Sequence, residues 1–278
     1  MTSKDFAHLH VHTEYSMLDG AAKIKKLISE VKAQGQNAVA ITDHGYCFGA
    51  YEFYKAATAE GIKPIIGVEA YVTPGTSRFG SDRKLWGDET QRADDVSARG
   101  AYTHMTLLAE NNTGLHNLFR MSSLASLEGQ MGKWPRMDQD LLETYHSGLI
   151  GTAGCPSGEV QTRLRLGQFD EAYRAAGQMQ ELFGKDNYFV EVMDHNNAIE
   201  RRVSNELIEL ARKIGAPIIA TNDSHYVREE DAPIQDAMLC INSGSTLQDP
   251  DRFTFDGTGY HLRSSNDMWD LFGDIPCL

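Results

Sequence analysis

Seven short apolar runs recur along this chain, and stretches with the periodicity of amphipathic helices separate them. The runs cover residues 6–11, 38–42, 64–72, 103–109, 148–152, 188–193 and 217–221. Ile24, Leu27 and Val31 have the spacing of one helix face, and residues 199–215 repeat this pattern. Strands that alternate with helices predict a mostly parallel sheet with crossover helices.

The number of strand–helix units favours a closed barrel in a chain of 278 residues. An open, doubly wound sheet is the alternative. However, the sequence contains neither the Gly-x-Gly-x-x-Gly nor the P-loop signature of nucleotide-binding sheets. We therefore expect an α/β fold with a barrel over about residues 5–230.

Two segments do not fit the repeat. Residues 73–100 are polar, charged and too long for a plain connection, so we expect an inserted surface loop. From about residue 231 we expect a C-terminal extension, in which residues 252–255 and 260–263 flank two glycines and predict a hairpin. The sequence stops at Leu278 without an obvious terminal element, which suggests a fragment.

The formal net charge of −13 argues against a protein that coats nucleic acid by charge alone. It is compatible with an acidic site filled by metal cations, because such ions reverse the local sign. No apolar run approaches the roughly 18 residues of a membrane helix, and the N-terminus lacks a signal-peptide pattern. We therefore expect a cytoplasmic protein with no membrane partner.

The four cysteines predict neither a zinc ribbon nor a disulfide framework. Cys47, Cys155, Cys240 and Cys277 form no Cys-x-x-Cys pair, and a cytoplasmic chain of this size does not depend on disulfides.

Three histidines end the first predicted strand. Side chains alternate along a strand, so His8, His10 and His12 are expected on one face. Active sites of α/β barrels lie at the carboxyl ends of their strands. Two imidazoles two positions apart can bind one metal ion there. The alternative interpretation is a polar strand end with hydrogen-bonded histidines.

The next two strands carry similar side chains. Asp43 and His44 follow the second strand, where Asp43 either orients an imidazole or caps the next helix. Glu69 stands inside the apolar third strand, and a carboxylate there is costly unless it is paired or binds a metal.

Two later strands end in further candidate ligands. Cys155 lies between a strand and a helix, a position that lowers the pKa of a thiol. Three interpretations of this residue are open: a nucleophile, a metal ligand or a buried small residue. Asp223 and His225 follow the seventh strand. Asp19, taken alone, is a turn residue before Gly20. These histidines and carboxylates suit Zn²⁺, Mn²⁺ or Fe²⁺, and they are too many for one ion. A cluster of two or three ions activates water for displacement at phosphorus.

Five motifs together resemble a known family. They are residues 8–20 (HLHVHTEYSMLDG), 42–45 (TDHG), 67–71 (GVEAY), 155–159 (CPSGE) and 221–225 (TNDSH). This set resembles the PHP (polymerase and histidinol phosphatase) domains, and most closely those of DnaE-type bacterial DNA polymerase III alpha subunits. The similarity runs through nearly the whole chain, 1–278, and includes residues 102–109 and Arg252-Phe253.

The resemblance implies a distorted seven-stranded (β/α) barrel with two or three divalent metal ions, Zn²⁺ or Mn²⁺, with Fe²⁺ as a further option. Matched position by position, the implied ligands are His10, His12, Asp19, His44, Glu69, His104, Cys155, Asp223 and His225. Asp19 and Asp223 would be catalytic through the metals and their bound water. His104 fits this ligand set poorly, because it begins the fourth predicted strand and would lie at the end of the barrel opposite to the other ligands.

The remaining histidines match no ligand position. His8 is expected behind the ligands, as a partner of one of them. The others are expected to be structural or surface residues, and they are His116, His146, His195 and His261.

The resemblance further implies a 3′→5′ exodeoxyribonuclease that proofreads for the polymerase domains of a longer chain within the replisome. Those polymerase domains are absent from this sequence, so it is not expected to extend DNA. Two alternatives stay open: a small-molecule phosphomonoesterase of the histidinol-phosphatase type, and a non-catalytic structural metal-binding module. Basic residues that could contact the DNA 3′ end, or be ordinary solvated charges, are Arg78, Arg83, Lys84, Arg163 and Arg165.

Overall fold

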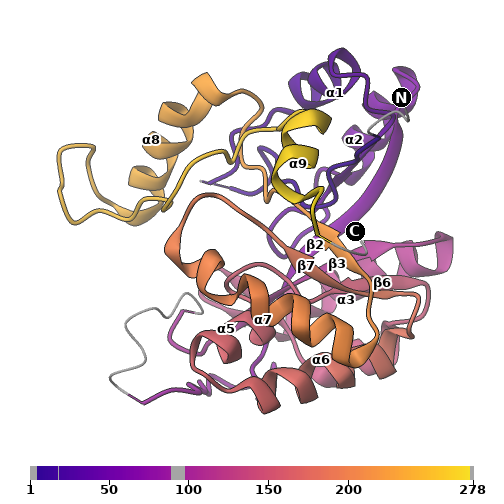
Figure 1. Ribbon diagram of the computed structural model, residues 1–278, viewed down its shortest axis with the longest axis vertical. Coiled ribbons are helices and arrows are strands. Elements are labelled where there is room, and N and C mark those ends of the chain that lie inside the picture. The colour runs from indigo at the N-terminus through magenta and orange to yellow at the C-terminus, as the bar shows by residue number, and fades with distance from the viewer. Residues whose placement is uncertain (1–4, 18, 89–97, 276–278) are drawn as a thin grey trace.

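The computed structural model describes residues 5–17, 19–88 and 98–275, which form a curved mixed sheet with helices around it (Figure 1). The sheet order is β4-β5-β2-β3-β6-β7-β8, and β1 also pairs with β2. The strands are β1 (Ala38–Ile41), β2 (Lys63–Val72), β3 (Thr103–Ala109), β4 (Gln130–Met131), β5 (Trp134–Met137), β6 (Leu149–Thr152), β7 (Tyr188–Val192) and β8 (Ile218–Ala220). Six of them coincide with predicted apolar runs.

The first predicted strand is irregular, but its backbone joins the two ends of the regular sheet. On one side, the Ala40 N–H donates to the His8 carbonyl at 2.8 Å, next to β1. On the other, the His12 N–H donates to the Ser224 carbonyl at 2.7 Å, beyond β8, and the Ser224 N–H donates to the His10 carbonyl at 3.1 Å. The seven predicted strand positions therefore form a distorted ring, in agreement with the predicted α/β barrel.

Strand β3 is an exception to the predicted parallel order. It runs antiparallel to β2, with Val72 opposite Thr103, and antiparallel to β6, with Ala109 opposite Leu149. The pairs β1–β2, β6–β7 and β7–β8 are parallel. The amino end of β3 therefore lies beside the carboxyl ends of its neighbours. This corrects the expected position of His104, which stands at that amino end.

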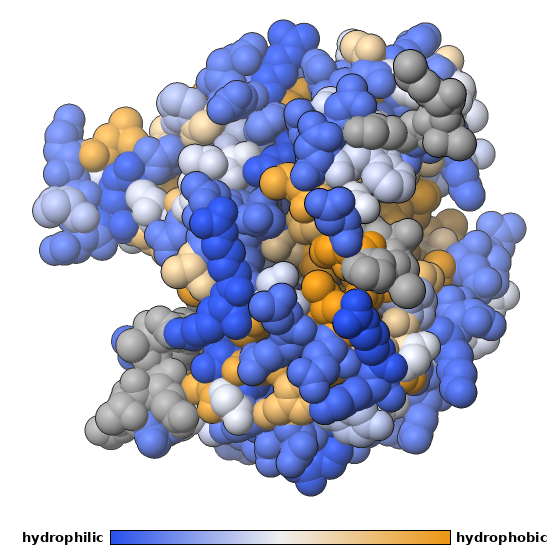
Figure 2. All heavy atoms as spheres, viewed as in Figure 1, coloured by the Kyte–Doolittle hydropathy of each residue, from blue (hydrophilic) through white to orange (hydrophobic). Residues whose placement is uncertain are grey.

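Helices pack around the sheet, apart from the helix at residues 232–243, which projects away from it (Figure 1). The described α-helices are α1 (Ile24–Ala33), α2 (Ala50–Ala59), α3 (Asn112–Glu128), α4 (Gln139–Tyr145), α5 (Glu159–Arg165), α6 (Phe169–Phe183), α7 (Ala198–Ile214), α8 (Ala232–Ser243) and α9 (Ser265–Phe272). The predicted face of α1 is buried, and α7 ends at Gly215 in the left-handed conformation that favours glycine. Met268 and Phe272 of α9 belong to the core. Figure 2 shows hydrophobic side chains gathered between α9 and α7 on an otherwise mostly hydrophilic face.

The described part of the segment 73–100 contains no helix or strand, and Arg78 attaches it to the barrel. The Arg78 guanidinium is 8% exposed and lies 2.8 Å from a carboxylate oxygen of Glu128 and 2.8 Å from one of Asp138. Arg78 is therefore a buried ion-pair partner and not a solvated charge.

Replacing Arg78 with methionine should destabilise the chain by about 3 kcal/mol, because it leaves the largely buried Asp138 carboxylate without its cation. Urea unfolding measures this loss. Arg174→Met is the matched control, since the Arg174 side chain is 67% exposed and should cost less than about 1 kcal/mol. Equal unfolding free energies of the two variants would contradict the structural role of Arg78.

The predicted C-terminal hairpin is not formed. Residues 252–255 and 260–263 make no ladder with each other, and the chain instead crosses the region beyond β8. There His261 forms a bridge with Tyr226, and the Asn222 side chain donates to the carbonyls of Gly259 and His261 at 2.8 and 2.7 Å. These long-range bonds replace the local pairing that a hairpin would need. None of the described helices is long and apolar enough to cross a membrane.

Candidate metal centre

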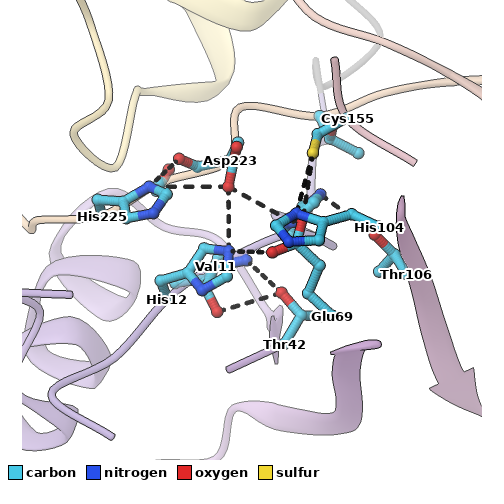
Figure 3. A network of polar contacts seen from close by, with 12 residues as sticks. Val11, His12, Thr42, Glu69, His104, Thr106, Cys155, Asp223 and His225 are labelled. Atoms are coloured by element: carbon cyan, nitrogen blue, oxygen red, sulfur yellow. Dashed lines mark hydrogen bonds and ion pairs between the residues drawn. The ribbon is translucent and has the colours of Figure 1, made fainter. Parts of the chain in front are cut away.

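The nine side chains implied as ligands converge at one end of the barrel. Seven of them line a cavity of about 550 Å³, and these are Asp19, His44, Glu69, His104, Cys155, Asp223 and His225. His10 and His12 are fully buried and contact both Glu69 and Asp223. Figure 3 shows the central part of this cluster.

Glu69 is the centre of the cluster. Its carboxylate is 1% exposed and lies 2.7 Å from His44 Nδ1 and 2.9 Å from His104 Nδ1. The Cys155 Sγ lies 3.1 Å from the same carboxylate, and His10 Nε2 lies 3.3 Å from it. The backbone of Glu69 forms a bridge with that of His44, which places the two side chains together. The buried Glu69 carboxylate of strand β2 is therefore surrounded by potential ligands.

Asp223 approaches the same histidines from the chain that follows β8. Its Oδ1 lies 3.1 Å from His12 Nε2 and 3.4 Å from His10 Nε2. Asp223 has a φ of 39°, in the left-handed region that a non-glycine residue rarely adopts. The bonds of Asn222 and of the Ser224 backbone hold the chain on both sides of it. This strained backbone aims the carboxylate into the cluster.

His44 is the centre of a third set of contacts, next to the cavity. His44 Nε2 is 2.9 Å from Asp19 Oδ2, so the turn aspartate reaches the cluster. The His12 ring lies 4.1 Å from the His44 ring and 4.3 Å from the His225 ring, measured between centroids. Three overlapping sets of residues bring their potential ligand atoms within 4.8 Å of one another. These sets are His12/His44/His225, His10/His12/Glu69 and His44/Glu69/His104.

The residues fit a group of divalent metal ions. Seven side-chain atoms of the cluster are buried and make no hydrogen bond of normal geometry with the described residues, namely His10 Nε2, His12 Nε2, Asp19 Oδ1, His44 Nδ1, Glu69 Oε2, His104 Nε2 and Asp223 Oδ1. Buried polar atoms are rarely left in this state, and here seven of them belong to one cluster. Imidazole nitrogens combined with carboxylate oxygens and a thiol suit Zn²⁺, Mn²⁺ or Fe²⁺. The observation does not distinguish between these metals.

The electrostatics keep the carboxylates charged. Burial alone raises the pKa of Glu69, but His104 and His44 outweigh it and hold that pKa well below its usual range. Burial likewise opposes ionisation of Asp223, whose pKa is lowered by His10 and His225. Burial and the charges of His44 and His225 lower the pKa of His12 to about 3, so this imidazole is neutral at pH 7.

Cys155 does not have the lowered pKa expected of a nucleophile. Burial and the neighbouring Glu69 carboxylate raise the pKa of its thiol well above the usual value. Its Sγ lies 3.5 Å from His104 Nδ1, inside the cluster. The expected effect of the strand-to-helix position is therefore overridden by burial. This geometry favours the metal-ligand interpretation over the nucleophile.

Glu191 of β7 is a site residue that the sequence interpretation missed. It is fully buried, and its Oε1 lies 2.7 Å from His10 Nδ1. The hydroxyls of Thr152 and Thr221 donate to this carboxylate at 2.5 and 2.6 Å. A carboxylate that accepts from the second nitrogen of a ligating imidazole fixes its tautomer and direction. The signal was present, because Glu191 stands in an apolar strand as Glu69 does.

Glu191→Gln should weaken metal binding by about 10- to 100-fold, because the amide does not hold the His10 tautomer as the carboxylate does. Titration of metal-free protein with Zn²⁺ against a chromophoric chelator measures this. Glu209→Gln is the control for the same change of charge, since Glu209 is exposed and pairs with Lys213 on α7, outside the implied ligand set. Equal affinities for both variants would show that Glu191 does not position a ligand.

Asp43 is linked to the implied ligand His12 through the Ser16 hydroxyl. Its Oδ1 accepts from the Ser16 hydroxyl at 2.8 Å, and the Ser16 oxygen lies 2.8 Å from His12 Nδ1. Helix α2 begins only at Ala50, so Asp43 does not cap it. Of the two interpretations of Asp43, the structure supports the one in which it orients an imidazole.

The other histidines lie outside the cluster. His8 Nε2 lies 2.8 Å from the Arg263 carbonyl, so His8 holds the C-terminal segment and does not support a ligand as expected. His195 is buried against Glu200 and is structural. His116 is exposed, and His146 and His261 are half-buried.

Three of the other basic residues considered as DNA contacts have partners within the chain. Arg163 packs over the Trp86 ring at 4.0 Å, and Arg165 donates to the Pro156 carbonyl at 2.5 Å. Arg83 donates to the Ala98 carbonyl, also at 2.5 Å. Lys84 lines a separate cavity beside α5 and α6.

Comparison with known proteins gives one family. The model of the PHP domain matches residues 8–195. The chain is 58% identical over 269 residues to the DNA polymerase III subunit alpha of Mycobacterium tuberculosis, covering 97% of this chain and 23% of that protein. It is 43% identical over 278 residues to the protein of the same name from Thermus aquaticus, covering 98% of this chain and 22% of that one. The chain thus spans less than a quarter of the length of these relatives.

Among solved structures, a putative metal-dependent phosphoesterase from Bifidobacterium adolescentis has a TM-score of 0.48 and 12% identity, with 96% of each chain covered. This likeness is too weak to bear on the chemistry of the site.

Proposed function

This chain belongs to the PHP domain family, and from that premise we propose that its side-chain cluster is a divalent metal centre that hydrolyses phosphoesters. The observation that carries the proposal is the convergence of nine histidine, carboxylate and thiol side chains at one cavity, with seven of their buried polar atoms making no hydrogen bond of normal geometry with the described residues. A purely structural site would not need an accessible cavity of about 550 Å³ above it.

The chain's own residues would have distinct roles. When bound, divalent ions supply an activated water and stabilise the charge that develops during displacement at phosphorus. Glu69 and Asp223 are ionised and face several imidazoles each, so they would hold adjacent ions together. Asp19 and His44, which lie 2.9 Å apart, would also act as ligands. Cys155 would bind as a thiolate, because metal binding removes the thiol proton.

We further propose that the substrate is a DNA 3′ end, and that the activity is 3′→5′ exonucleolytic proofreading. Support comes from the identity to DNA polymerase III alpha subunits over nearly the whole chain. Because these relatives are more than four times longer, the polymerase domains of the same full-length protein would be the immediate partners, within a cytoplasmic replisome. Asp19 and Asp223 would be the catalytic carboxylates, acting through the metals.

The proposal is tested with a 5′-labelled primer–template that carries a 3′-terminal mismatch, digested in Mn²⁺ and in Zn²⁺. We expect products that shorten one nucleotide at a time from the 3′ end. A small phosphate monoester is offered in parallel. Hydrolysis of the monoester alone would replace the exonuclease with a small-molecule phosphatase, and tight metal binding with no hydrolysis would leave a structural module.

A further inference from the structure

An aromatic wall, formed by Phe253 and Phe255, stands at one side of the cavity above the cluster. The Phe255 ring meets the His225 ring edge-on at 4.7 Å between centroids, and the Phe253 ring meets the Phe255 ring at 6.0 Å. The three rings therefore lead outward from an implied ligand. Phe253 is 60% exposed, so its ring contributes little to the core and is available to a bound molecule.

The aromatic wall rests on the barrel through its next few residues. The Thr258 N–H donates to the His195 carbonyl at 2.8 Å, and Gly257, at a φ of 87°, leaves no room for a side chain beside that carbonyl. The Tyr260 ring stacks on the buried His195 ring at 3.9 Å and also contacts the Phe255 ring at 4.9 Å. A platform held in this way loses little conformational entropy when a flat molecule stacks on it.

A second series of rings begins at another implied ligand. The Tyr102 ring stacks on the His104 ring at 5.2 Å, and the Trp134 ring lies 5.2 Å from the Tyr102 ring. His225 and His104 lie on opposite sides of Asp223 in Figure 3. All of these aromatic residues line the same cavity. The cavity therefore has aromatic side chains on two sides and the cluster at its base.

The distribution of charge in the cavity indicates where a phosphate and where an uncharged group of a ligand would bind. The described residues that line it include five carboxylates, on Asp19, Glu69, Glu200, Asp223 and Asp256. Lys133 is the only lysine or arginine among them, and its Nζ donates to Asn242 at 2.6 Å. A phosphate can therefore bind only where cations fill the cluster or near Lys133. The rings are suited to a planar, uncharged group.

We propose that the aromatic wall stacks against the base of a 3′-terminal nucleotide that is unpaired from its template. This inference rests on the proposed function and specifies its substrate. Base stacking on aromatic rings tolerates any base, as a proofreading site must. A cavity of about 550 Å³ has the size of a site for one small ligand, whereas a paired terminus would bring a second strand with it. The size of the cavity thus favours an unpaired end, and the Phe253 ring would stack on its base.

The experiment compares two single-stranded oligonucleotides that differ only at the 3′-terminal nucleotide, which is either normal or abasic. Initial rates of terminal release in Mn²⁺ are measured for the wild type, Phe253→Ala and Phe253→Trp. We expect Phe253→Ala to lower kcat/KM about ten-fold on the oligonucleotide with the normal end, mainly by raising KM. On the abasic oligonucleotide, Phe253→Ala and the wild type should have equal kcat/KM, because there is no base to stack. Phe253→Trp should retain the wild-type rate, because it keeps a stacking ring. Phe79→Ala is the matched control, since Phe79 is 67% exposed on the inserted segment and should change neither rate.

Equal losses on the normal and the abasic end, or no loss on either, would overturn the stacking role while leaving the exonuclease in place. If the wild type releases no nucleotide from either oligonucleotide, the proposed function fails and this inference fails with it.

Discussion

Replacing Asp223 with asparagine is expected to slow DNA hydrolysis on the order of a thousand-fold or more. The Asp223 Oδ1 lies 3.1 Å from His12 Nε2 and 3.4 Å from His10 Nε2. Its negative charge would therefore attract cations to these two imidazoles. The amide has nearly the same shape but no charge. The initial rate on a 5′-labelled oligonucleotide in Mn²⁺ gives the effect.

Asp186→Asn is the matched control for this variant. Asp186 is exposed in the turn before β7, so the same change of charge there should leave the rate within about two-fold. Circular dichroism and the unfolding temperature establish that both variants are folded. If Asp223→Asn keeps more than about a tenth of the wild-type rate at equal metal content, the assigned role of Asp223 is wrong.

Removal of the metals should lower the unfolding temperature by about 10 °C. Ions that bind only the folded chain at a thousand-fold excess over Kd stabilise it by about 4 kcal/mol, and each kcal/mol shifts the unfolding of a chain of this size by a few degrees. The effect should be large here because the metal-free cluster keeps unsatisfied polar atoms of His10, His12 and Asp223 in a buried place.

Calorimetry of chelator-treated protein, before and after Zn²⁺ is restored, checks this shift. The Asp223→Asn variant should show a smaller shift, because it lacks one charged ligand. Identical unfolding temperatures for the metal-free and the Zn²⁺-restored wild type would mean that the ions do not bind at a site that exists only in the folded chain.

Local patterns predicted six of the eight described strands and most of the cluster, but not β4 or β5. Histidines at a strand end, as at His10 and His44, and a lone carboxylate in an apolar strand, as at Glu69, are signals that a short stretch of sequence carries by itself. Glu191 carries the same signal and could have been found. Asp19 differs, because its local pattern is that of a turn, and only the resemblance to a family gave it a role.

The features that the sequence did not predict depend on long-range pairing. The direction of β3, and with it the place of His104, is set by partners in β2 and β6. The fate of residues 252–263 depends on bonds to Asn222 and Tyr226. Arg78 appears as a free surface charge in sequence, but its carboxylate partners stand 50 and 60 positions later. No local periodicity encodes such contacts.

Anomalous diffraction from crystals of this chain grown with Mn²⁺ is the most direct test of the metal centre. The account predicts two or three peaks among the side chains around Glu69 and Asp223, at ligand distances from His12 and His225. A fully occupied peak elsewhere with none in this cluster, or a cluster without any peak at saturating Mn²⁺ and at saturating Zn²⁺, would contradict it.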